Sequence, residues 1–128
     1  MALGLSSTVA NALLDALGNA ANYTAPTAVW IKLHTADPGA AGTSNAATET
    51  TRKQASFAAA SGGSMASDAS ISWTSIAGSQ DATHFSAWDA STNGNFLFSG
   101  TITANAYTAG DTYTVASGAL TVTLNTAA

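Results

Sequence analysis

The chain of 128 residues has no cysteine and few charged residues, with three Lys or Arg and seven Asp or Glu. Without cysteine, disulfides and thiolate metal ligands are excluded. Three cationic side chains and a net charge of −4 cannot build the basic patch that neutralises phosphates, so we expect no nucleic-acid partner. No apolar run approaches the length of a membrane span, and no Lys or Arg precedes the first apolar stretch as in a secretory signal. We therefore expect no membrane partner and synthesis in the cytoplasm.

Ala, Thr, Ser, Gly and Asn take the place of the missing charges. Hydrophobic residues still make up 46% of the chain, which favours a folded domain over a disordered segment. The length fits one domain, residues 1–128. Interface cores are depleted in charge, so much of this surface is expected to contact other chains in a homo-oligomer, with a trimer as one arrangement. The alternative is that Thr, Ser and Asn alone keep the surface hydrated.

One helix is predicted over about residues 6–18. Leu5, Val9, Leu13 and Leu17 recur at four-residue spacing, and alanines with high helix propensity fill the intervening positions. Ser6 or Ser7 can cap the start, and Gly18 with the following Asn provides a stop. We expect the apolar stripe to pack on a sheet, or alternatively to dock on a partner protein.

From about residue 27 to residue 126 the apolar period becomes two. Short strands are predicted around residues 29–34, 71–73, 85–87, 96–98, 113–115 and 120–125. Asn93-Gly94 is a hairpin signal, because both residues tolerate positive φ. Residues 36–45 and 58–69 are expected to be loops. The pattern predicts a mainly β fold, an antiparallel β-sandwich (jelly-roll-like) with one N-terminal α-helix.

Candidate chemistry is sparse. His34 and His84 each have an aspartate nearby, but no spacing requires a metal, and ordinary surface or hydrogen-bonded histidines are the simpler interpretation. No Gly-x-Ser-x-Gly elbow occurs, and most of the scattered carboxylates stand in predicted turns. Tryptophans could stack on sugars, but they fall on predicted strands. We therefore expect no catalytic residue, metal, cofactor or enzyme activity.

Several segments resemble a known family. They are Leu33-His-Thr-Ala-Asp-Pro-Gly39 with Thr51-Arg-Lys53, then Ile71-Ser-Trp-Thr74, Thr83-His-Phe-Ser-Ala-Trp-Asp89 and Gly94-Asn-Phe-Leu-Phe-Ser-Gly100. Together with the leading helix, they make the chain similar to short actinobacteriophage proteins of the tail fibre, minor tail or head decoration type. The resemblance covers almost the whole chain and implies a structural role in the virion.

The sequence-based interpretation is a bacteriophage capsid decoration (cement) protein that binds the major capsid protein on the capsid exterior and stabilises the shell. A compact domain in many copies suits such a lattice. The alternative is a tail fibre or minor tail protein that contacts the host surface, and a remote alternative is a carbohydrate-binding module. The predicted virion-contact residues are Leu3, Leu5, Val9, Leu13 and Trp30.

Overall fold

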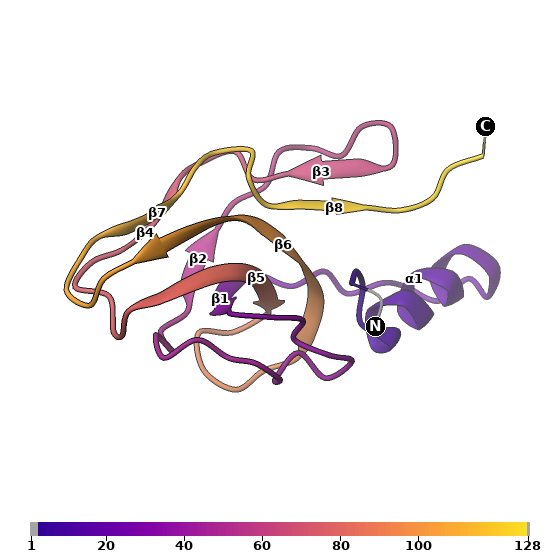
Figure 1. Cartoon of the computed structure of the whole chain (residues 1–128). Coiled ribbons are helices and arrows are strands. Elements are labelled where there is room, and N and C mark those ends of the chain that lie inside the picture. The colour runs from indigo at the N-terminus through magenta and orange to yellow at the C-terminus, as the bar shows by residue number, and fades with distance from the viewer. Residues whose placement is uncertain (1–2, 128) are drawn as a thin grey trace.

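A computed structural model describes residues 3–127 as one helix followed by eight strands (Figure 1). The elements are α1 (Ser7–Gly18), β1 (Val29–His34), β2 (Lys53–Ala55), β3 (Ser64–Ala66), β4 (Ile71–Trp73), β5 (Gln80–Trp88), β6 (Phe96–Tyr107), β7 (Tyr113–Val115) and β8 (Thr121–Thr123).

The main sheet has four antiparallel strands in the order β2-β1-β5-β6. β1 pairs with β5 so that Trp30 lies opposite Trp88 and His34 lies opposite His84. The two longest strands, β5 and β6, form a hairpin around Asn93 and Gly94, which have φ values of +57° and +78°. The predicted hairpin at this dipeptide is therefore confirmed, for the backbone reason expected.

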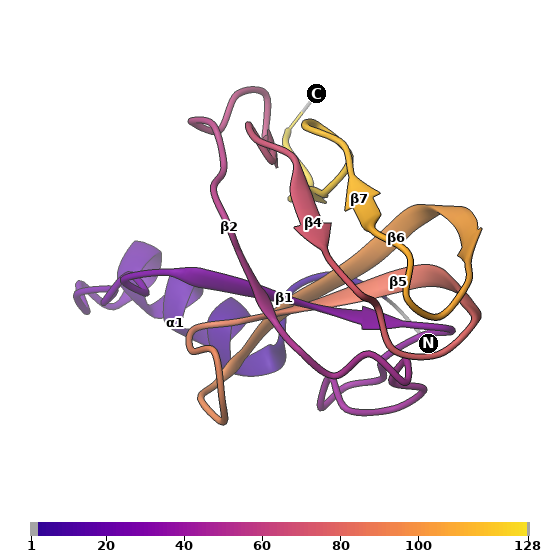
Figure 2. The same cartoon turned by 90° about the vertical axis from the view of Figure 1, so that its left-hand side faces the viewer.

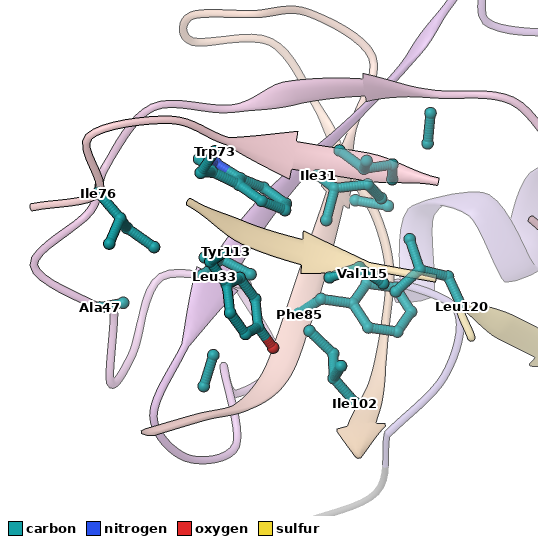
Figure 3. Close-up of a cluster of buried hydrophobic side chains, with 14 of the residues drawn as sticks. Ile31, Leu33, Ala47, Trp73, Ile76, Phe85, Ile102, Tyr113, Val115 and Leu120 are labelled. Atoms are coloured by element: carbon teal, nitrogen blue, oxygen red, sulfur yellow. The ribbon is translucent and has the colours of Figure 1, made fainter. Parts of the chain in front are cut away.

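A second layer consists of two short antiparallel pairs, β3 with β8 and β4 with β7. Figure 2 shows β4 and β7 side by side, crossing over the layer that contains β1 and β5. The core lies between the layers. Its buried side chains include Ile31, Leu33 and Phe85 from the main sheet and Trp73, Ile76, Val115 and Leu120 from the opposite side (Figure 3). The predicted mainly β, antiparallel, sandwich-like fold with one N-terminal helix is confirmed.

The other face of the main sheet is covered by the loop that follows β1. The backbone N–H of Gly39 donates to the side chain of Asp37, which turns the chain just after Pro38. Gly42, with a φ of +73°, then comes so close to the ring of Phe96 that a Cβ atom would lie 2.5 Å from it. This loop buries His34, the last residue of β1, completely. The interpretation of this residue as a hydrogen-bonded histidine is confirmed.

Two segments differ from the sequence-based expectation. The Gly-rich stretch within residues 58–69, expected to be a loop, contains β3, because Gly62 and Gly63 at positive φ turn the chain back onto itself. The last strand is shorter than predicted and spans only Thr121–Thr123, although Leu120 beside it is fully buried as its alternation requires. The alternation of side chains does not by itself determine the length of β8. Among the described strands, β8 pairs only with β3, and this pairing covers three residues of each strand.

Candidate functional site

Helix α1 begins and ends where the local sequence predicts. The Ser6 hydroxyl accepts a hydrogen bond from the backbone N–H of Val9 at 3.2 Å, which satisfies one of the free donors of the first turn. At the other end the backbone N–H of Asn19 donates to the carbonyl of Asp15 at 2.9 Å. The helix predicted over residues 6–18 is confirmed.

The helix is attached to the body through the residues at its start. Gly4 to Ser6 run antiparallel to the beginning of β6, where the Ser6 N–H donates to the Leu97 carbonyl at 2.8 Å. The Ser99 N–H donates in turn to the Gly4 carbonyl at 2.9 Å. The side chains of Leu5 and Val9 pack against the core. The attachment therefore combines a short added strand segment with one helical turn of apolar packing.

Beyond its first turn, α1 extends away from the sheets. Figure 1 shows it at one end of the molecule, and none of its residues is buried. Leu14 is 63% exposed and Leu17 is 85% exposed. The expectation that the whole apolar stripe packs on the sheet is therefore wrong for Leu17. The spacing of apolar residues predicts one face of the helix, but of that stripe only Leu5 and Val9 pack against the core.

A hollow of about 520 Å³ lies between α1, the extended segment after it and the end of the β5–β6 turn. We call it the helix hollow. Its lining residues are Thr8, Val9, Ala12, Asn22, Tyr23, Thr24, Ala25, Pro26, Asp89, Asn95, Phe96 and Leu97. Tyr23 is 37% exposed, so an aromatic ring is available at its surface. The exposed leucines and the helix hollow together form a candidate assembly surface.

The predicted virion-contact residues occupy different positions relative to this surface. Leu3 is 37% exposed and Val9 lines the helix hollow, while Leu5 and Leu13 are half-buried. Trp30 is half-buried on β1 and does not line the helix hollow. Sequence reasoning missed Tyr23, Pro26 and Phe96, which lie in segments without helical periodicity and meet only in the folded chain.

Within residues 3–127, no three His, Cys, Asp or Glu side chains are grouped closely enough to hold a metal ion. The helix found in this part of the chain lacks the length and apolarity needed to cross a membrane. The helix hollow is lined mainly by small, aromatic and amide side chains, and aromatic side chains are enriched at contacts between chains.

Comparison with known proteins identifies the family. The family model described as podophage GP4 fiber I protein gp80 matches residues 4–123, nearly the whole chain. The protein belongs to this family of phage fibre proteins. No curated protein matches the chain. The predicted role as a phage structural protein is confirmed, and the family fits the tail-fibre alternative better than capsid decoration.

Proposed function

We propose that this protein is a subunit of a phage tail fibre, located on the tail of the virion and without enzyme activity. The observation that carries the proposal is the match of a fibre-protein family to residues 4–123. Because the match includes both the helix and the sandwich, the fibre role applies to the whole described fold.

The fold supports different roles for the sandwich and for α1 within such a subunit. The sandwich has its own core and needs no other chain to bury its apolar residues. The helix, in contrast, leaves leucines exposed and has 12 residues, a length at which an isolated helix is marginal in water. We assign α1 to contacts with other chains and the sandwich to the exposed part of the fibre.

The occupant that fits the assembly surface is a second copy of this chain. The same molecule has an apolar projection, formed by Leu14 and Leu17, and an apolar-lined recess, the helix hollow. A projection of one copy that fills the recess of the next is a head-to-tail contact, which closes into a ring when the rotation permits. This supports the homo-oligomer expected from the low charge.

The test is the number of copies per virion and their position. Quantitative mass spectrometry against the major capsid protein should give a ratio of a few per cent, because symmetry allows few tail-fibre subunits. Antibody labelling in electron micrographs should then mark the tail. A ratio near one chain per capsid subunit, with label over the head, would contradict the proposal and favour capsid decoration.

A further inference from the structure

A second hollow, of about 390 Å³, is lined in part by the β5–β6 turn. We call it the polar hollow. Its lining residues come from β1, from the segment before β2 and from the β5–β6 turn: Lys32, Thr50, Thr51, Arg52, Ser91, Thr92 and Asn93. Three separate parts of the chain therefore converge on one small polar recess.

The charge of the polar hollow is opposite to that of the molecule. The whole chain has only three Lys or Arg and a net charge of −4, yet two of those three cations line this recess. No carboxylate is among its lining residues, although Asp89, which lines the helix hollow, attracts Arg52 electrostatically. In a chain with so few cations, this pairing concentrates positive charge at one place and favours an anionic ligand there.

Arg52 is held rigidly at the edge of the recess. Its guanidinium carbon lies 4.2 Å from the centre of the Trp88 ring, in a cation–π contact. Its Nη1 donates to the carbonyls of Ala90 at 2.8 Å and Asn93 at 2.6 Å. Within residues 3–127, Nε and Nη2 make no hydrogen bond. The guanidinium is therefore held in one orientation, which reduces the entropy lost on binding a ligand, and its Nε and Nη2 donors are available to that ligand.

The walls beside Arg52 are also fixed. The backbone N–H of Thr51 donates to the Glu49 carboxylate at 3.1 Å, and its carbonyl accepts from the Trp73 indole at 2.8 Å. On the opposite wall, Asn93 is held in the left-handed region by the hairpin turn. Hydroxyl and amide groups on these walls, exposed at Thr50, Ser91 and Thr92, can donate to and accept from sugar hydroxyls.

We propose that the polar hollow binds a saccharide carrying an oxyanion, a carboxylate or a phosphate, on the host surface. The oxyanion would lie between the Lys32 ammonium and the Arg52 guanidinium, and the Thr and Ser hydroxyls would contact the sugar ring. The host-surface source of this ligand rests on the proposed fibre function. The binding itself does not, because it belongs to residues within one chain.

The test is calorimetric titration of the purified full-length chain at 0.15 M salt, a condition that screens weak surface attraction. The probes are tetragalacturonate for the carboxylate, glucose 6-phosphate for the phosphate, and neutral maltotetraose as the control sugar. We expect one or both anionic probes to bind and maltotetraose to give no heat. Which anion binds identifies the chemical source. No binding of either anionic probe, or equal binding of maltotetraose, would overturn the proposal.

Matched variants separate the recess from the overall charge. Lys32→Gln should weaken binding about tenfold, the ratio that corresponds to loss of one charge-assisted hydrogen bond. Lys53→Gln removes the same charge from the residue next to Arg52, but Lys53 does not line the polar hollow. The affinity of the Lys53→Gln variant for the anionic probe should therefore equal that of the wild type. Equal weakening by both variants would overturn the proposal.

A third variant tests the geometry. Arg52→Lys keeps the charge and loses the planar fork, so binding should weaken while the circular-dichroism spectrum and thermal midpoint show that the fold persists. A folded Arg52→Lys variant with unchanged affinity would contradict the proposed role of the guanidinium. These measurements use the isolated chain, and the fibre assignment is tested on the particle, so each proposal can fail without the other.

Discussion

His34 and Ser86 are joined by a 2.7 Å hydrogen bond between imidazole Nε2 and hydroxyl, and both side chains are fully buried. The other ring nitrogen, Nδ1, lies 2.8 Å from the carbonyl of Ser44, which can only accept. Nδ1 therefore carries the hydrogen, and Nε2 accepts from Ser86. The Trp88 indole donates to the same hydroxyl at 2.8 Å. Nε2 can accept the hydrogen bond from Ser86 only when His34 is neutral, because a protonated imidazole has two donors and no acceptor.

The folded state should therefore lose stability in mild acid. Burial lowers the pKa of His34 below 6.5, and nearby Lys32 and His84 act in the same direction, against the Ser44 carbonyl. Since the unfolded chain then binds the proton more readily, the stability contributed by His34 is present above pH 6.5 and falls as the pH drops below that value. Urea denaturation between pH 8 and pH 5.5 should show a slope of up to about 1.4 kcal/mol per pH unit.

A histidine pair provides the control for this slope. His84 lies opposite His34 on β5, is only half-buried and contacts the hydroxyl of Thr83 at 2.8 Å. His34→Gln should remove most of the dependence on pH between 6.5 and 5.5, whereas His84→Gln should keep it. A wild-type stability that is flat through this range would show that the buried imidazole is not the titrating group.

Glu49 should be required for stability although it lines neither hollow. It is 8% exposed, and its two carboxylate oxygens accept from the N–H groups of Ala77 at 3.0 Å and Thr51 at 3.1 Å. Burial raises the pKa of Glu49, but these N–H groups outweigh burial and hold it below the ordinary value. Glu49→Gln would turn an amide donor toward a backbone donor and should cost about 1–3 kcal/mol in urea unfolding at pH 7. Asp81→Asn, at an exposed position, should leave the midpoint unchanged.

Gly42 should tolerate no side chain. Gly42→Ala combines an unfavourable positive φ with a Cβ atom placed 2.5 Å from the Phe96 ring, and we expect it to lower the free energy of unfolding by about 2–4 kcal/mol. Gly110 has a φ of +91° but open space around it, so Gly110→Ala should show only the backbone cost of about 1 kcal/mol. Equal losses in thermal unfolding would mean that Phe96 moves aside freely.

The exposed leucines of α1 should matter for assembly and not for folding. Replacing Leu14 and Leu17 together with Ser removes apolar groups that contact little of the chain's own body, so the unfolding midpoint should change little. Light scattering coupled to size exclusion should, however, show a shift from oligomer to monomer. The control is Leu33→Ala at a fully buried position, which should destabilise the chain by about 2–5 kcal/mol. An unchanged oligomer in the double Ser variant would contradict the assembly surface.

Local signals were the predictable part of this fold. The Ser6 cap, the alternation along β1 and the Asn93-Gly94 turn each depend on neighbours within a few positions, and all three are present. The exposure of Leu17 could not be predicted, because periodicity marks an apolar face without saying what covers it. The pairing of β3 with β8 joins positions 64–66 to positions 121–123, and no local pattern specifies a contact over that distance.

The two hollows were beyond prediction for the same reason. The polar hollow is built from position 32, positions 50–52 and positions 91–93, and the pairing of β1 with both β2 and β5 brings them together. The resemblance to phage virion proteins, in contrast, depended on residue identity along the chain and correctly indicated the structural class. It did not distinguish head from tail, because a sandwich core is compatible with either location.

The pairing of residues 4–6 with the start of β6 also determines when, during synthesis, the helix can be anchored to the sheet. The Leu5 partner, Phe98, is made more than ninety positions later. While a ribosome synthesises the chain, residues 4–6 therefore have no strand edge to join until β6 has emerged. The helix that is proposed to join neighbouring subunits is made before the eight described strands and is anchored only after β6 is made, so its leucines are available to other growing copies until then.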